Sequence, residues 1–164
     1  MVLTAHAITG TALASLTPNE PLVGFTVGFL SHFILDAVPH WDYFLRSMKK
    51  DENNPMNNNM TINADFWRDL LKIGFDAMLG ISLAYLIFGF YMKYSTLIIL
   101  CGVIGAMMPD ALQFAYMKWK HEPLTSLRRF HLWIHSKISL NNNPVIGILS
   151  QIVFVFFIVW WTKI

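Results

Sequence analysis

The residues best suited to chemistry in this sequence are histidines and aspartates that recur at short spacings. In the string SHFILDAVPHWDY, His32 and Asp36 are four residues apart, and His40 and Asp42 follow directly. Side chains four residues apart share one face of a helix and can bind one metal ion. Pro39 is expected to end the helix and turn His40 and Asp42 back toward Asp36. The string therefore predicts a site of imidazole and carboxylate ligands.

A second segment, RRFHLWIHSK, repeats the same spacing. His131 and His135 are four residues apart, and Arg128 and Arg129 come directly before them. The mixture of apolar and basic side chains is typical of a helix that lies at a membrane surface. This segment predicts two further metal ligands, with two arginines placed to hold a phosphate group.

Three single residues complete the set of candidates. In GAMMPDAL, Pro109 precedes Asp110, and a proline inside a helix favours a carboxylate that faces a cavity rather than lipid. His6 interrupts the first apolar segment, and Asp76 lies one or two turns inside a later one. Ionisable groups within membrane helices are costly and usually mark a functional site.

The ligand types restrict the metal. The single cysteine, Cys101, lies inside an apolar run, so the sequence offers no thiolate cage and no disulfide framework. Imidazole and carboxylate ligands suit Zn²⁺, and Mn or Fe would suit them as well. The candidates outnumber the three or four ligands of one catalytic zinc ion, which predicts either two ions or residues that orient the ligands.

The elements that position these residues are apolar segments. Of the 164 residues, 55% are hydrophobic and only 13% are charged, about half the charged fraction of a soluble domain. We expect an all-α polytopic membrane protein with about five transmembrane helices in a single domain. The predicted segments are Val2–Leu16, Leu22–Val38, Leu70–Met92, Ser95–Met117 and Val145–Trp161.

Charge predicts how the segments are oriented. If all five cross the membrane, then residues 39–69 and residues 118–143 lie on one side, together with the first residues of the chain. That side holds ten of the twelve Lys and Arg residues, and only Lys93 and Lys163 lie opposite. By the positive-inside rule, this side faces the cytoplasm. The candidate histidines and aspartates fall at the same depth, which predicts one site at the cytoplasmic surface of the membrane.

Two polar stretches connect the segments. Residues 41–65 include the run NNPMNNNM and are expected to form a mobile loop without a core of its own. Residues 118–143 are expected to form a cytoplasmic loop that contains the interfacial helix. The net charge of +2 is too small to indicate a nucleic-acid partner, so the predicted partner is the lipid bilayer.

The four motifs together resemble the YdjM-like inner-membrane proteins, a family of membrane-bound metal-dependent hydrolases. The resemblance rests on an early H-x-x-x-G string and on S-H-x-x-x-D, G-x-x-x-P-D and H-x-x-x-H-S strings. The matching residues here are His6 with Gly10, Ser31 with His32 and Asp36, Gly105 with Pro109 and Asp110, and His131 with His135 and Ser136. The order of the strings departs from the family pattern, since the S-H-x-x-x-D string comes before the P-D string.

The resemblance implies hydrolysis of an ester or phosphoester, such as a phospholipid, by metal-activated water. Asp42 or Asp76 would then accept the proton, and Arg128 and Arg129 would bind the phosphate.

Two non-enzymatic alternatives stay open. The cluster could bind a structural metal or form a buried polar network that holds the helices together. A metal transporter is less favoured, because a transporter needs ionisable groups along a path across the membrane.

Overall fold

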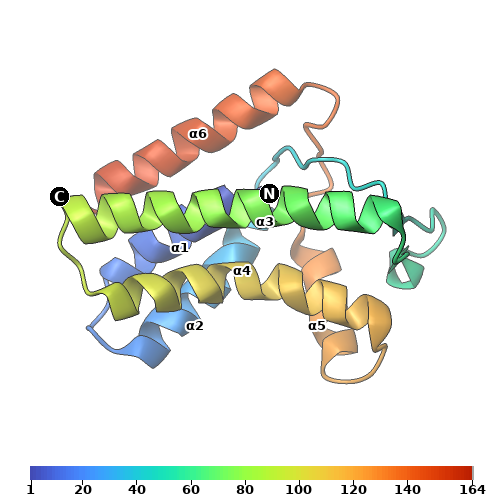
Figure 1. Ribbon diagram of the computed structural model, residues 1–164, viewed down its shortest axis with the longest axis horizontal. Coiled ribbons are helices and arrows are strands. Elements are labelled where there is room, and N and C mark those ends of the chain that lie inside the picture. The colour runs from blue at the N-terminus through green and yellow to red at the C-terminus, as the bar shows by residue number, and fades with distance from the viewer. Residues whose placement is uncertain (164) are drawn as a thin grey trace.

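The computed structural model describes residues 1–163, which are mainly helical (Figure 1). Two short strands, β1 (Met48–Lys49) and β2 (Asn59–Met60), and a 3₁₀ turn, η1 (Pro55–Asn57), lie between the second and third helices. A π-helical segment, η2 (Tyr85–Tyr91), continues the third helix. The six α-helices of the described residues are α1 (Leu3–Ser15), α2 (Pro21–Asp36), α3 (Ala64–Ala84), α4 (Thr96–Lys118), α5 (Leu124–Ile134) and α6 (Pro144–Trp161).

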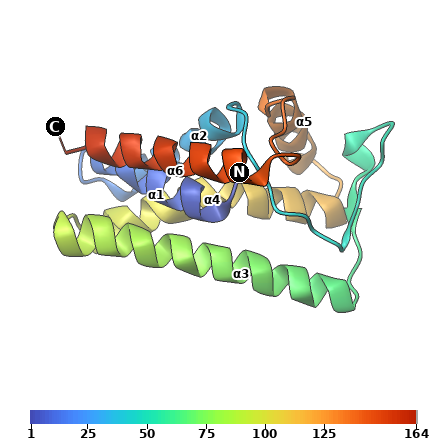
Figure 2. The same cartoon turned by 90° about the horizontal axis from the view of Figure 1, so that it is seen from above.

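Helix α1 is the central element of the fold. It packs against α2, α3, α4 and α6, which surround it in both ribbon views (Figures 1 and 2). Ten of its 13 residues are buried, and most of them are alanine, threonine or glycine. Small side chains allow neighbouring helices to approach closely, as is typical of helix packing in membranes. His6 is therefore held in the interior rather than at a surface.

Helices α2 and α4 are in close backbone contact. A Cβ atom on Gly28 would overlap the carbonyl oxygen of Gly102, and one on Gly105 would overlap the carbonyl oxygen of Phe25. Only glycine permits this approach, because it carries no side chain. The contact places the end of α2 beside the middle of α4 and so brings Asp36 near Asp110.

Three helices of the described residues are long and apolar enough to cross a membrane: Ala64–Tyr91, Thr96–Lys118 and Pro144–Trp161. Helix α2 is apolar but has 16 residues, and α1 has 13. At 1.5 Å per residue, α1 and α2 extend about 20 and 24 Å, less than the roughly 30 Å of a hydrocarbon core. Five transmembrane helices are therefore not confirmed.

The ends of the spanning helices agree with the charge pattern of the sequence. The connection between η2 and α4 and the carboxyl end of the chain lie at the same end of the molecule (Figure 1). Lys93 and Lys163, the two lysines predicted to lie opposite the others, belong to these two segments.

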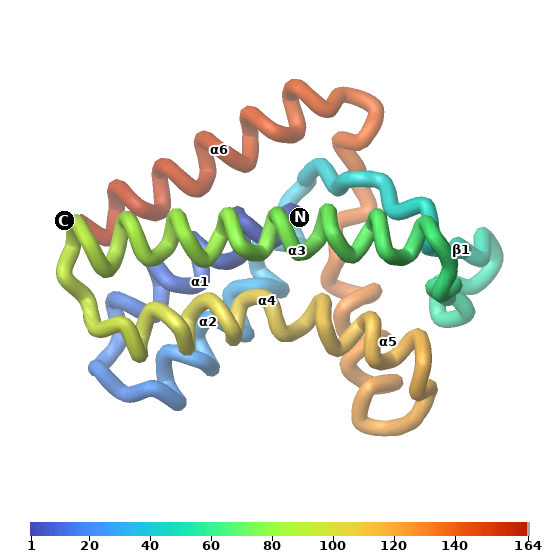
Figure 3. The backbone as a smooth tube through the Cα atoms, in the orientation of Figure 1, coloured from blue at the N-terminus to red at the C-terminus, as the bar shows by residue number. Residues whose placement is uncertain are grey.

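The segment over residues 41–63, which lies within the predicted mobile loop, contains the two short strands and the 3₁₀ turn. It runs from the end of α2 along α3 to the start of α3 (Figure 3), and Met48 pairs with Met60 in a short antiparallel hairpin. Met60 is buried with Phe66 and Met117 in a small apolar cluster. Met48 and Met60 supply the apolar contacts that this segment makes with the cluster.

The interfacial helix predicted within residues 118–143 corresponds to α5. Its apolar Phe130 and Trp133 are exposed, whereas Arg128 and His131 are buried against the rest of the protein. Helix α5 thus turns Arg128 and His131 inward, toward the ends of α2 and α4.

Candidate metal centre

The centre of the candidate site is the carboxylate of Asp36, at the last residue of α2. Asp36 is only 2% exposed, yet the Nε2 nitrogens of five histidines lie within 4 Å of its oxygens. The distances are 2.9 Å for His131, 3.2 Å for His6, 3.3 Å for His32, 3.8 Å for His40 and 3.9 Å for His135. These imidazoles come from α1, α2, α5 and the residues that follow α2 and α5. The structure therefore gathers five of the predicted ligands around a sixth.

Backbone hydrogen bonds hold the two segments that carry His40 and His135. The amide of Ser136 donates to the carbonyl of Asp36 at 2.7 Å, and the amide of Leu140 donates to the carbonyl of His40 at 3.0 Å. The rings of His40 and His135 consequently lie side by side, with centroids 4.8 Å apart. As predicted from Pro39, α2 ends at Asp36 and the chain turns His40 back toward it.

Three of the imidazoles are oriented by backbone carbonyl groups. Nδ1 of His32 lies 2.8 Å from the carbonyl oxygen of Ala106. Nδ1 of His40 lies 2.7 Å from the carbonyl oxygen of Val38, and Nδ1 of His135 lies 3.0 Å from that of Ser136. A carbonyl oxygen only accepts hydrogen bonds, so Nδ1 carries the proton and Nε2 has a free lone pair. Carbonyl groups orient metal-binding histidines in this way.

The inward-facing nitrogens fit a metal better than a hydrogen-bonded network. Nε2 of His6, His32 and His40 is buried and has no hydrogen-bond partner. Burying such a nitrogen without a partner is costly in a network without a metal. Neutral imidazole nitrogens and carboxylate oxygens are the ligands that Zn²⁺ accepts, so the donor set fits the predicted ion.

The candidate ligands divide into two groups that share Asp36. Ligand atoms of His32, Asp36, Asp110 and His131 lie within 4.8 Å of one another, and so do those of Asp36, His40 and His135. His131 and His135, predicted to bind one ion because of their spacing, thus fall in different groups. Helix α5 ends at Ile134, and the extended backbone of His135 carries its side chain toward His40. Asp36 is the one residue common to both groups.

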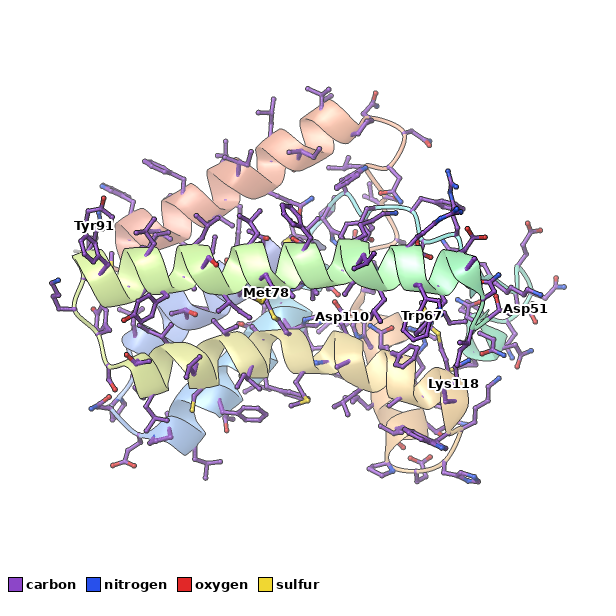
Figure 4. All side chains as sticks on the ribbon, in the orientation of Figure 1. Asp51, Trp67, Met78, Tyr91, Asp110 and Lys118 are labelled. Carbon is purple, nitrogen blue, oxygen red and sulfur yellow. The ribbon has the colours of Figure 1, made fainter. Side chains whose placement is uncertain are left out.

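The edge of the centre holds three partly exposed side chains. The side chains of Asp110, His135 and Asp42 are 36%, 34% and 42% exposed, in contrast to the buried Asp36. Asp110 lies partway along α4 (Figure 4), with Oδ1 3.7 Å from Nε2 of His32. A substrate or water could reach the centre from this edge.

Asp42 interacts with the same cluster. Its Oδ2 lies 3.3 Å from Nε2 of His40, and its Oδ1 lies 2.7 Å from the amino-terminal nitrogen of Met1, which is also 3.0 Å from Asp36. Burial raises the pKa of Asp42, but His40 and the amino-terminal charge outweigh it and hold that pKa below its ordinary value. Burial also lowers the pKa of His135, which favours the neutral imidazole that binds metals.

Gln113 is a site residue that the sequence interpretation missed. Its Nε2 donates to Oδ1 of Asp110 at 2.9 Å and lies 3.3 Å from Nε2 of His131, and its Oε1 accepts a hydrogen bond from Arg128. The three-residue spacing from Asp110 along α4 is the signal that could have identified it.

The structure does not bring Asp76 or Arg129 into the cluster. Both carboxylate oxygens of Asp76 accept hydrogen bonds from the start of α1, at 2.7 Å from the Leu3 amide and 3.1 Å from the Thr4 amide. Asp76 therefore caps α1 and positions His6 indirectly. Arg129 is exposed on α5, whereas Arg128 is buried. Burial lowers the pKa of the Arg128 guanidinium.

Comparison with known proteins gives no match. No family model, curated protein or solved structure is significantly similar to this chain. The resemblance of the four motifs to the membrane-bound hydrolases therefore stays a prediction, and the function has to be inferred from the centre itself.

Proposed function

We propose that this protein is a membrane-embedded metal-dependent hydrolase related to the YdjM-like family. Its substrate is a phospholipid or another membrane-borne phosphate ester. The observation that carries the proposal is the convergence of five Nε2 nitrogens on Asp36, three of them in rings that backbone carbonyls orient. We infer one or two divalent ions, with zinc as the preferred metal.

With two ions, His32, Asp36, Asp110 and His131 would hold one, and Asp36, His40 and His135 would hold the other. His6 stacks on His32 with ring centroids 4.0 Å apart and supports its orientation. When bound, a divalent ion supplies an activated water, whose pKa falls to about 7.

Asp42 is the carboxylate that would accept a proton from such a water. This carboxylate is partly exposed at the accessible edge and lies 3.3 Å from His40. Asp76, the other candidate proton acceptor, lies outside the cluster, where its carboxylate binds the start of α1. We therefore assign proton transfer to Asp42 and leave Asp76 a positioning role.

Arg128 is the residue that would hold the phosphate group. Its guanidinium is buried next to Gln113, and its Nε has no hydrogen-bond partner. A guanidinium can bind two phosphate oxygens at once. The exposed Arg129 would instead attract anionic headgroups to the membrane surface. The excess of Lys and Arg on this side supports a location at the cytoplasmic face of a bacterial inner membrane.

The first experiment is metal analysis combined with a hydrolysis assay. The protein is purified without a chelator or a histidine tag, as wild type and with His32→Ala, His131→Ala or the control His121→Ala. His121 is exposed between α4 and α5, outside the cluster. We expect one or two equivalents of metal and hydrolysis of phospholipid vesicles, both lost in the two cluster variants and kept in the control.

Two results would overturn the proposal. Bound metal without turnover of any ester or phosphoester would indicate a structural metal site. A folded wild-type protein that takes up no added metal would indicate a polar network that holds the helices together.

A further inference from the structure

An apolar groove runs along the protein beside the metal centre. It encloses a cavity of about 440 Å³ between α1, the helix formed by α3 and η2, and α6. Ile152, Val155 and Val159 of α6 form one wall, and Leu83 and Ile87 form the other. These residues belong to two of the helices that are apolar enough to cross a membrane, so the groove lies at the depth of the lipid chains.

The arrangement of the helices explains the groove. Helix α6 packs on α1 and makes few contacts with α3. In Figure 1, α3 and α6 approach each other near the carboxyl end of the chain and diverge toward the start of α6. Ala5 and Ile8 of α1 form the floor between them. The groove is therefore open to the side, where it would face the bilayer.

The groove ends beside the metal centre. Trp41 and Gln151 line this end, and Nε2 of Gln151 donates to the carbonyl of Trp41 at 2.9 Å. Trp41 stands between His40 and Asp42 in the chain, and both of these belong to the cluster. A molecule that lies in the groove would thus present one of its ends to the cluster.

The size of the groove selects its occupant. The lining residues of α6 run from Ile148 to Val159, which corresponds to about 16 Å at 1.5 Å per residue. That length is roughly half of a 30 Å hydrocarbon core, the depth of one leaflet and of one lipid acyl chain.

We propose that the groove binds a single acyl chain of a membrane lipid and places the ester or phosphoester of that lipid at the metal centre. The second half of this inference rests on the proposed hydrolase function, but the binding of the chain does not. The substrate class is therefore a lipid ester of the leaflet that faces the site, rather than a water-soluble phosphate ester.

Photocrosslinking tests the binding of the chain directly. The full-length protein in nanodiscs is mixed with a phosphatidylglycerol that carries a diazirine midway along one acyl chain, and crosslinked residues are mapped by mass spectrometry. Ile152→Trp adds bulk within the groove, and Val153→Trp places the same side chain on the outer face of α6, at a residue that does not line the groove. We expect crosslinks at groove residues of the wild type that fall at least tenfold in Ile152→Trp and persist in Val153→Trp.

Equal labelling of the groove and of the outer face, unchanged by Ile152→Trp, would overturn the proposal and show ordinary lipid contact only. If Ile152→Trp does not fold, as judged by circular dichroism and size-exclusion chromatography in detergent, then Ile148→Trp at the cluster end of the groove provides the same test.

A hydrolysis assay distinguishes binding of the acyl chain in the groove from the proposed hydrolase function. Ile152→Trp is expected to lose turnover of the long-chain lipid while keeping turnover of its dibutyryl analogue and its bound metal. Equal loss for both substrates would contradict a role of the groove in positioning the substrate. A wild type that crosslinks in the groove but hydrolyses neither lipid would refute the hydrolase and leave the groove as a lipid-binding site.

Discussion

Nε2 of His131 lies 2.9 Å from Oδ2 of Asp36, although 95 positions separate the two residues in the chain. This contact joins the motif at the end of α2 to the motif on α5. Neither motif offers enough ligands for two ions by itself, and the shared carboxylate makes them one centre. The arrangement leads to predictions about metal binding and about the residues that support it.

The first prediction concerns the number of bound ions. Because Asp36 belongs to both ligand groups, Asp36→Asn is expected to lose all of the bound metal. His135→Ala removes a ligand of one group only and is expected to lose about half. Elemental analysis of the purified variants measures this difference. Full metal content in Asp36→Asn would contradict the bridging role.

The second prediction concerns Gln113, which links Asp110, His131 and Arg128. Gln113→Leu removes these hydrogen bonds without removing a ligand, so we expect metal affinity to fall about 10- to 100-fold. Competition with a chelating dye measures the affinity. Ala111→Leu, on the exposed face of α4, is the matched control. Wild-type affinity in Gln113→Leu would mean that Gln113 does not orient the ligands.

The third prediction separates capping from catalysis at Asp76. Asp76→Ala leaves the Leu3 and Thr4 amides without their partner, so it is expected to destabilise the protein by about 1–2 kcal/mol. Metal content should stay at the wild-type level. Thermal unfolding in detergent measures the loss, and Asp65→Ala, which breaks the exposed ion pair with Arg68, should cost less. An inactive Asp76→Ala variant of unchanged stability would instead restore Asp76 as the proton acceptor.

The fourth prediction concerns the contact between α2 and α4. A methyl group on Gly28 would overlap the backbone of Gly102, so Gly28→Ala should force the helices apart and cost about 1–3 kcal/mol or more. Metal affinity should fall as well, because Asp36 and Asp110 would separate. Gly74→Ala, where a Cβ meets nothing within 4 Å, is the control and should be neutral or stabilising. Equal stability of the two variants would show that the close approach is not required.

Local spacing was enough to predict part of the centre. The four-residue interval of His32 and Asp36 predicted their proximity because both lie on α2, where that interval returns to the same face. Pro39 predicted the end of the helix and the return of His40 for a similarly local reason. The spacing of His131 and His135 was less informative, since α5 ends between them and the two rings turn toward different ligand groups.

By itself the sequence determined the apolar segments and the ligand types available, because hydropathy and helical periodicity act over a few residues. It did not give the start of α3, which lies at Ala64 and not at the predicted Leu70. Only the tertiary structure decided that Asp36 is central, that Gln113 belongs to the site and that Asp76 caps α1 instead. These outcomes depend on contacts between segments tens of residues apart, such as the glycine contact of α2 with α4. The groove beside α6 likewise depends on how three helices pack, which no local pattern of residues specifies.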